Sequence, residues 1–479
     1  MEEKRYYTQK EIDEYLEQLD EYNKKQEMSA DMHNHTTGSD GDDSPLMLLL
    51  RAHTKGIKTI SITDHNSTGG YRKLQEQIDT LMERYEDIVS SAETSEVEKQ
   101  KAKTGAKKLL KILNEVTIIT GCEVLTVYKG CPYVEILAYD VDLEILDQKL
   151  DEARIGLEKS TDVLFKGLKE AARKHNIKID EFFLDNLSDY RKLFFHEMIR
   201  HPENAKFSEG IEGETEEEKT QNFAQKFIDN PDSDFYVDLN NPKTRKAAMI
   251  KMIEQHKDLK FDTAIIKNAG IASGQFFTEI MKYPENKHLI DPRITSQKTF
   301  NYLGLYNESS PFFVDLSSTK PSPQRVIQAI HEAGGKALVA HWGRYLMSNK
   351  DVFDWTTQRG RDNLEEIIDM CDGAEWAYPD NPMDLRKMIY DMAKTKGKLI
   401  SIGGDNHGRK GKEGVQYQLG SQSGKEVDEL KWIKQSEMMG RDFVSRLEEK
   451  YSYRKRLQNV INNNVTETEN KQIDDGAER

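Results

Sequence analysis

Cysteine is scarce in this chain, and long apolar runs are missing from it. Only three cysteines occur, Cys122, Cys131 and Cys371, and none of them lies in a CxxC spacing. A count this small and odd predicts reduced thiols in a cytosolic protein. No run of 18 apolar residues is present, so no membrane-spanning helix is expected. The opening segment 1–5 leads into no apolar stretch, so we also expect no signal peptide and a cytoplasmic location.

An excess of positive charge is missing as well. The 479 residues include 69 Lys and Arg against 84 Asp and Glu, which gives a formal net charge of −15. Affinity for nucleic-acid backbones comes mostly from Lys and Arg that neutralise phosphates, so this balance argues against general nucleic-acid binding. It does not exclude a local basic pocket. The length allows one large α/β barrel with elaborations, or two or three ordinary domains.

Short apolar runs that end in polar residues recur along the chain. They cover residues 30–35, 57–65, 116–123, 134–140, 336–341 and 398–407. Helix-like segments separate several of them, for example 44–55 and 323–333. Strands that alternate with helices predict an α/β protein with a mainly parallel sheet.

The remaining segments have other patterns. Residues 8–29 predict a surface helix that begins with a capping box of Thr8 and Glu11. The region 150–310 is rich in Lys and Glu, and we interpret its middle, 190–265, as a helical insertion that caps the site or serves as a surface appendage. The expected domains are an N-terminal helix at 1–29, barrel parts at 30–189 and 266–410 around that insertion, and a helical extension with a polar tail at 411–479. We expect residues 455–479 to be disordered, because they have few apolar anchors.

A pair of histidines ends the first predicted strand. His33 and His35 are separated by one residue, so both imidazoles lie on one face of a strand and can reach one cation. An HxH pair alone is weak evidence of a metal site. Asp40 follows on a turn bracketed by Gly38 and Gly41 and adds a carboxylate.

The second predicted strand delivers Thr63, Asp64 and His65 to its C-terminal end. The competing interpretation is a turn with a helix cap, because Asp and Thr are common at such caps. Three polar groups directly after an apolar run favour a functional site.

Two glutamates belong to the next two predicted strands. Glu123 ends the run 118–123, where it would start a solvated loop or bridge the cations of a multinuclear site. Glu135 lies inside the apolar run 134–137, where a charge is costly unless it is paired or ligated. We favour a metal ligand at Glu135, with a salt bridge as the alternative.

The last two runs deliver His341, and then Asp405 and His407, to strand ends. Five of the twelve histidines thus occupy predicted strand ends, each close to a carboxylate or to another histidine. Barrel enzymes place their chemistry at the C-terminal ends of strands, so the clustering itself indicates an active site.

Competing catalytic motifs are missing or incomplete. Residues 420–425 resemble a phosphate-binding loop, but their spacing is wrong and no Ser or Thr follows Lys425. There is no G-x-S-x-G motif, and Cys122 is interpreted as a small buried apolar residue.

Taken together, these motifs resemble those of the polymerase and histidinol phosphatase (PHP) superfamily. The resemblance rests on 33–35 (HNH), 38–41 (GSDG), 62–65 (ITDH), 121–123 (GCE), 333–341 (AGGKALVAH) and 404–407 (GDNH). It covers about residues 30–140 and 266–410. It implies a distorted seven-stranded (β/α) barrel that holds two or three divalent metal ions and hydrolyses phosphoesters.

The resemblance also implies which residues would bind each metal. The first metal would be held by His33, His35, Glu123 and Asp405, the second by Glu123, Glu135 and His341, and the third by Asp40, His65 and His407. Asp64 would orient one of these ligands from behind. The family usually has His where this chain has Glu135, and a carboxylate there favours a harder cation such as Mn²⁺.

The implied chemistry is attack on phosphorus by a metal-activated hydroxide, with Mn, Fe or Zn as the metal. Arg344 is a candidate phosphate clamp, because guanidinium binds phosphate in a bidentate manner; a surface salt bridge is its alternative role. We expect a small-molecule or nucleotide phosphatase. The alternatives are a nuclease or phosphodiesterase acting on short single-stranded nucleic acid, and a non-catalytic scaffold. No membrane partner is expected.

Overall fold

The computed structural model describes residues 30–157, 159–187, 272–408, 419–420 and 442–462, with a few isolated positions between 193 and 222. The expected helix at 8–29 lies outside the described residues. So does the expected insertion at 190–265, apart from those isolated positions.

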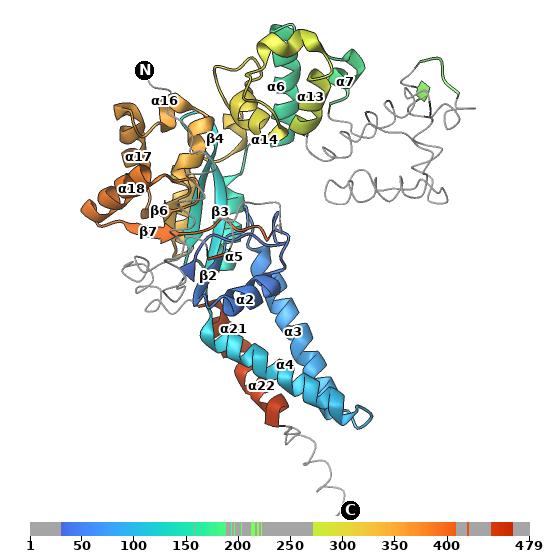
Figure 1. The fold of residues 1–479 in the computed structure, drawn as a ribbon, viewed down its shortest axis with the longest axis vertical. Coiled ribbons are helices and arrows are strands. Elements are labelled where there is room, and N and C mark those ends of the chain that lie inside the picture. The colour runs from blue at the N-terminus through green and yellow to red at the C-terminus, as the bar shows by residue number, and fades with distance from the viewer. Residues whose placement is uncertain are drawn as a thin grey trace, which may run out of the picture.

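Seven strands form the centre of the fold (Figure 1), and neighbours in the sheet are also neighbours in chain order. They are β1 (Ala30–Asp31), β2 (Thr59–Ile62), β3 (Thr117–Tyr128), β4 (Cys131–Tyr139), β5 (Lys336–Val339), β6 (Gly373–Ala377) and β7 (Leu399–Ile402). The amide of Met32 donates to Ile402 O at 3.0 Å, and the amide of His35 donates to Asn406 O at 2.8 Å. These two bonds join the last strand to the chain that leaves the first, so the sheet curves into a nearly closed barrel, as the sequence predicted.

One strand runs against the others and makes the barrel irregular. β4 pairs antiparallel with both β3 and β5, whereas the remaining neighbours pair in parallel. Lys129 and Gly130 connect β3 to β4 with φ angles of 47° and 80°. A two-residue hairpin turn with both φ values positive matches strand twist, and glycine adopts the second of them without steric cost.

The predicted strands agree with the observed ones except at two places. All six predicted apolar runs contain a strand, and every residue of β2 is buried, as expected for a strand covered on both faces. The sequence reasoning missed β6. It also ended the third strand at Glu123, whereas β3 continues to Tyr128, because its hairpin with β4 extends the pairing.

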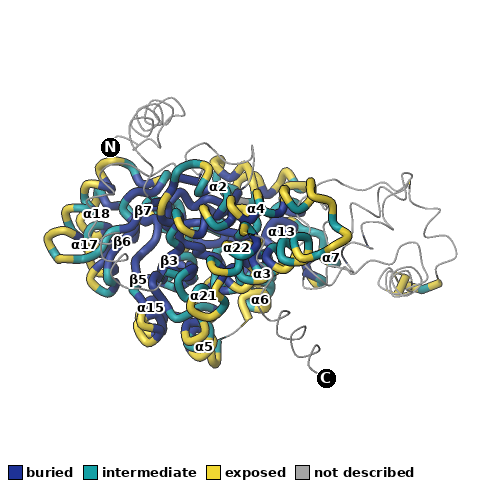
Figure 2. The backbone as a smooth tube through the Cα atoms, turned by 90° about the horizontal axis from the view of Figure 1, so that it is seen from below, coloured by how far each residue is buried: buried dark blue, intermediate teal, exposed yellow. Residues whose placement is uncertain are grey.

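Helices surround this sheet. The α-helices are α2 (Pro45–Thr54), α3 (Gly69–Ser90), α4 (Glu96–Glu115), α5 (Leu143–Ala153), α6 (Ser160–Lys174), α7 (Glu181–Asp185), α13 (Ala272–Ile280), α14 (Gln297–Phe300), α15 (Pro323–Glu332), α16 (Lys350–Phe353), α17 (Gln358–Met370), α18 (Met383–Thr395), α21 (Phe443–Tyr451) and α22 (Tyr453–Asn462). Short 3-10 helices are η2 (Pro284–Leu289), η4 (Ser317–Thr319) and η5 (Trp342–Met347), and η3 (Asn301–Leu305) is a π-helix. Figure 2 shows buried strands enclosed by helices whose outer faces are exposed.

Local sequence explains where the two predicted helices begin. Ser44 precedes Pro45 in α2, and Ser322 precedes Pro323 in α15; each serine side chain accepts a hydrogen bond from a backbone amide of the first turn. Proline at the first helical position costs no hydrogen bond and has a helical φ. Both predicted helices are confirmed, to within a residue or two at each end.

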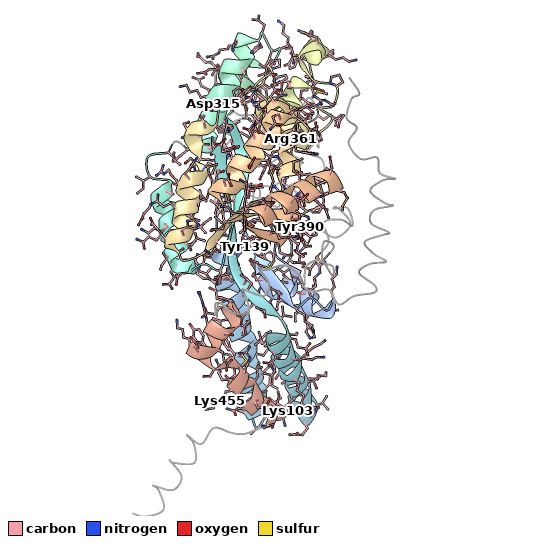
Figure 3. The ribbon with its side chains drawn as sticks, turned by 90° about the vertical axis from the view of Figure 1, so that its left-hand side faces the viewer. Lys103, Tyr139, Asp315, Arg361, Tyr390 and Lys455 are labelled. Atoms are coloured by element: carbon pink, nitrogen blue, oxygen red, sulfur yellow. The ribbon has the colours of Figure 1, made fainter. Side chains whose placement is uncertain are left out.

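The interior of the barrel is a packed apolar core that receives side chains from most of its strands. It contains Ala30, Met32, Ile119, Leu137, Tyr139, Leu338, Ala340, Ala377 and Ile402. Tyr139, labelled in Figure 3, lies in the middle of the sheet, and its hydroxyl donates to Met32 O at 3.0 Å. A filled interior leaves the strand ends, and not a central pore, as the place for a site.

Residues 160–187 and 272–316 form a helical lobe beside the barrel (Figure 1). The lobe has its own apolar core, which includes Leu168, Phe276, Phe300 and Leu305. It contacts the barrel through Tyr133 of β4, whose ring packs on Tyr306 with centroids 4.0 Å apart. The sequence expectation had assigned these segments to the barrel itself.

The C-terminal helices complete a helical arm made of α3, α4, α21 and α22. Lys103 and Lys455 mark the part of this arm far from the sheet (Figure 3). Residues 455–462 belong to α22, so the expectation of disorder was wrong for them: Leu457 and Val460 supply apolar anchors, and the Arg456 guanidinium pairs with Glu86. No helix within the described ranges is long and apolar enough to cross a membrane.

Asp442 joins this arm to the barrel and provides a test of the packing. Its carboxylate caps α21 at Ser445 N and also accepts a hydrogen bond from Ile118 N of β3, each at 2.8 Å. We expect Asp442→Ala to lower the free energy of unfolding by about 1–3 kcal/mol in urea denaturation, because a strand amide loses its acceptor together with the cap. Asp142 caps α5 without such a strand contact. A loss no larger than that of Asp142→Ala would contradict the role of the strand contact.

Candidate metal centre

Nine side chains able to bind a cation gather at one end of the barrel. They are His33, His35, Asp40, His65, Glu123, Glu135, His341, Asp405 and His407, the nine residues predicted from the sequence. They form four overlapping groups in which the ligand atoms of each group lie within 4.8 Å of one another. The structure therefore brings all nine together, although they span more than 370 positions of the chain.

Strand direction explains this convergence. Six strands run parallel, so the residues that follow β1, β2, β5 and β7 meet at one rim. Glu135 reaches the same rim from the reversed strand. In the register of the hairpin, Glu123 is opposite Leu137, and Glu135 lies two residues before Leu137. Because side chains alternate along a strand, both glutamates point to the same face of the sheet.

Glu123 lies at the centre of the cluster. Its Oε1 is 2.9 Å from His341 Nε2 and 3.3 Å from His33 Nε2. Its Oε2 is 3.0 Å from His65 Nδ1 and 3.3 Å from His35 Nε2. A carboxylate with two imidazoles at each oxygen has the geometry of a bridging ligand.

Two further carboxylates flank this centre. Asp405 Oδ1 is 3.0 Å from His35 Nε2 and 3.6 Å from His33 Nε2. Asp40 lies on the other side, with its carboxylate oxygens 3.4 Å from His407 Nε2 and 3.7 Å from His65 Nε2. The Asp40 side chain is 48% exposed and that of His65 is 27% exposed, so the cluster is open on this side.

Glu135 faces the cluster and not a salt-bridge partner at the surface. Its Oε2 is 3.2 Å from His341 Nε2, and its Oε1 is 3.7 Å from His65 Nδ1. His65 therefore lies between the expected second and third metal positions. Glu135 groups with His65 and Glu123, a placement that suits a metal ligand.

Many ligand atoms of the cluster are buried without a hydrogen bond among the described residues. They are His33 Nε2, His35 Nδ1 and Nε2, His65 Nδ1, Glu123 Oε2, His341 Nδ1 and Asp405 Oδ1. Several of these atoms lie close to one another, but their angles do not suit a hydrogen bond. Each buried polar group left unpaired costs about 1–3 kcal/mol, so such a concentration fits atoms that coordinate a cation. Imidazole and carboxylate together suit Mn²⁺, Fe²⁺ or Zn²⁺.

The electrostatics of the cluster lead to the same conclusion. Burial alone would lower the pKa of His65, but the Glu123 carboxylate raises that pKa to about 10. Burial would raise the pKa of Glu123, but the imidazoles of His33 and His65 hold that pKa well below its usual range. Burial and the neighbouring Glu123 raise the pKa of Glu135. The carboxylates thus attract positive charge to this end of the barrel, and a bound cation would satisfy the same attraction.

Asp64 lies behind the cluster and contacts the turn that carries Asp40. Its carboxylate accepts hydrogen bonds from Thr36 N, Thr36 Oγ1 and Ser39 Oγ, each at 2.7 Å. It therefore holds the turn between His35 and Asp40 and makes no hydrogen bond to the side chain of a predicted ligand. A Cβ on Gly38 would lie 2.1 Å from the Asp64 carboxylate, which explains the glycine in this turn.

Arg344 belongs to the site and not to the protein surface. Its guanidinium donates to Asp405 Oδ2 at 3.0 Å and to the hydroxyl of Tyr302 at 3.1 Å. Tyr378 donates to the same oxygen of Asp405 at 3.1 Å. Tyr302 lies in the π-helix of the helical lobe, so the lobe helps to orient the arginine beside the cluster.

Sequence reasoning missed Glu375, which is 1% exposed and lies in β6. One of its oxygens is 2.9 Å from His33 Nδ1, and the other accepts the His341 amide at 2.9 Å. The signal was present in residues 373–377, where one charge interrupts an otherwise apolar run. The argument that identified Glu135 applies equally to this residue.

Glu135→Gln tests whether Glu135 binds metal. The substitution keeps the shape of the side chain and removes the charge that offsets repulsion between close cations. We therefore expect weaker metal binding and substantially slower phosphoester hydrolysis at limiting Mn²⁺. Glu135→His should retain measurable activity with altered metal preference. Glu366, whose carboxylate pairs with Lys129 at the surface, supplies the control variant Glu366→Gln. Full activity of Glu135→Gln at limiting Mn²⁺ would show that Glu135 is not a ligand.

Comparison with known proteins finds a family domain in the first half of the chain. The family model described as PHP domain matches residues 31–241, a range that includes the predicted ligands from His33 to Glu135. No curated protein matches the chain. One similar solved structure is named as a candidate metal-dependent phosphoesterase from Bifidobacterium adolescentis; it has 17% identity and a TM-score of 0.39, over 84% of this chain and 95% of its own. Another is named as an amidohydrolase from Chromobacterium violaceum with bound sulfate and no metal, with 16% identity and a TM-score of 0.37, over 83% of this chain and 90% of its own. The match to the family model places a PHP domain at residues 31–241, in agreement with the resemblance found in the sequence motifs.

Proposed function

We propose that this protein hydrolyses a phosphoester of a small molecule or nucleotide, using two or three divalent cations held by the nine-residue cluster. The observation that carries the proposal is the set of buried ligand atoms without hydrogen bonds, directly beside the cationic side chain of Arg344. Mn²⁺, Fe²⁺ and Zn²⁺ are the cations that fit these ligands.

Bound divalent cations would polarise the phosphate oxygens and supply a hydroxide at neutral pH. The protein's own contribution is to hold the ligands in place before the substrate arrives. Glu123 lies between two pairs of imidazoles, and Asp64 holds the turn that presents Asp40. Ligands held by rigid strand ends lose little freedom when a cation binds, which favours both affinity and turnover.

Arg344 is suited to bind the phosphate of the substrate. A guanidinium has five N–H donors, and the described residues accept hydrogen bonds from two of its nitrogens. Its side chain is 26% exposed, so the remaining donors are accessible to a ligand. Its planar fork matches two phosphate oxygens at once, which a lysine cannot do.

A small substrate agrees with the charge of the protein. The net charge of −15 opposes long nucleic acids, which need many cationic contacts along their backbone. A screen of phosphomonoesters against short 5′-phosphorylated oligonucleotides, each with Mn²⁺, tests the proposal. Faster cleavage of oligonucleotides would indicate a nuclease, and no hydrolysis of any phosphoester would indicate a scaffold.

Metal removal should abolish hydrolysis, because the cluster holds the cations that the reaction needs. Protein purified without added metal should contain more than one equivalent of Mn, Fe or Zn by elemental analysis. His33→Ala and Asp405→Ala should lower the rate by more than about 100-fold, beyond the typical effect of residues behind the ligands. His53 pairs with Glu115 away from the cluster, so His53→Ala is the control. Hydrolysis at the untreated rate after complete chelation would refute the proposal.

Arg344→Lys should lower kcat/KM on the order of 100-fold and weaken inhibition by inorganic phosphate, because lysine cannot replace the bidentate fork. Arg293 pairs with Asp291 on the surface, so Arg293→Lys provides a matched control that should leave both values unchanged. Metal content measured on the same samples separates a lost phosphate contact from a disturbed Asp405. Unchanged phosphate inhibition in Arg344→Lys would exclude Arg344 as the clamp.

A further inference from the structure

Glu375 is a buried carboxylate that contacts two segments carrying predicted metal ligands. It lies in β6, between the strands that deliver His341 and Asp405, and its side chain is fully enclosed. Its Oε1 is 2.9 Å from His33 Nδ1, and its Oε2 accepts the backbone amide of His341 at 2.9 Å. One side chain thus bonds to the chain after β1 and to the chain after β5.

The contact with His33 determines which nitrogen of that ring is available. A carboxylate only accepts hydrogen bonds, so the Nδ1 of His33 must carry the proton. The other nitrogen, Nε2, faces Glu123 Oε1 at 3.3 Å and Asp405 Oδ1 at 3.6 Å and has no hydrogen bond among the described residues. Nε2 is therefore the atom presented to a cation, with its lone pair directed at the cluster.

The second contact holds the backbone at His341. That residue is the second after β5, and its Nε2 lies 2.9 Å from Glu123 Oε1. Asn381 reinforces the same junction: its amide donates to Glu375 O at 3.3 Å and its carbonyl accepts from Gly343 N at 3.0 Å. The amides of His341 and Gly343 thus both donate to this region: His341 N to Glu375 in β6, and Gly343 N to Asn381 in the loop after β6.

We propose that Glu375 is a positioning residue that orients His33 and His341 together and so sets the affinity of the cluster for divalent metal. The inference rests on the metal-dependent function proposed above, and Glu375 itself is not placed among the metal ligands. Carboxylates that accept the second N–H of a ligating histidine fix its orientation and raise its basicity. Here one carboxylate does this for one ligand and anchors the backbone of another.

The chain contains a matched carboxylate at the opposite end of the same strands. Asp372, next to β6, accepts from the Ala337 amide at 2.9 Å and lies 2.7 Å from His331 Nε2. It therefore makes the same two kinds of contact, to one imidazole and one strand amide, away from the cluster. Comparing the two residues separates the support of metal ligands from the general support of strands.

The experiment titrates metal-free full-length protein with Mn²⁺ by calorimetry, and with Co²⁺ by visible absorption. In Glu375→Gln the amide oxygen can accept only one of the two hydrogen bonds, and its NH₂ group faces a donor. We expect its metal affinity to fall on the order of 10–100-fold and its Co²⁺ spectrum to change. Asp372→Asn should leave affinity and spectrum unchanged. Glu375→Asp, which keeps the charge but is too short for both contacts, should fall between wild type and Glu375→Gln.

Thermal denaturation of each metal-free variant shows whether it is folded, and Glu375→Asp replaces Glu375→Gln if the latter does not fold. Wild-type metal affinity in both Glu375 variants would overturn the inference and leave the proposed function standing. An equal loss of affinity in Asp372→Asn would also overturn it, because the effect would then be one of strand stability. Wild-type protein that binds no divalent metal would instead refute the proposed function, and the inference with it.

Discussion

The structure depends on holding four carboxylates and five imidazoles close together, most of them buried. Glu123 is fully buried between two pairs of histidines, an arrangement that is costly in an empty site. Unpaired buried polar atoms cost about 1–3 kcal/mol each, and a domain has only about 5–15 kcal/mol of net stability. The packing of the rest of the fold must therefore offset the free-energy cost of the unpaired polar atoms in the cluster.

In the barrel the predicted ligands lie at one end of the strands, and the apolar cores that stabilise the fold lie elsewhere. A packed interior lies beneath the cluster, and large apolar cores lie between the sheet and its helices. The reversed strand β4 adds the carboxylate of Glu135, which reaches this rim from a strand that runs against the other six. Asp405 adopts a left-handed φ of 51°, a conformation that non-glycine residues rarely adopt and that is often found at functional sites.

Parts of the chain outside the barrel also reach the site. The helical lobe supplies Tyr302, which binds the guanidinium of Arg344, while Arg344 itself pairs with Asp405. A predicted phosphate contact therefore depends on a π-helix more than forty residues away in the chain. The C-terminal helices have a structural role: as part of the helical arm they pack on the outer face of β2 and β3.

The sequence by itself predicted the nine residues that gather at one end of the barrel, and most of the strands. His33, His65 and Asp405 could be recognised because each comes one to three residues after an apolar run. Glu135 could be recognised because a charge inside an apolar strand needs a partner. These signals are local, so they can be read without knowing which strands are neighbours.

Only the tertiary structure decided what these residues contact. The reversal of β4, the length of β3 beyond Glu123, and the separate core of the helical lobe all depend on pairing between distant segments. The same is true of Asp64, whose partners lie on a turn after β1, and of Glu375, whose partners come from two other strands. A hydrogen bond between segments that are separate in the chain leaves no periodic pattern in the sequence, because it depends on how strands pack in space and not on the geometry of the local chain.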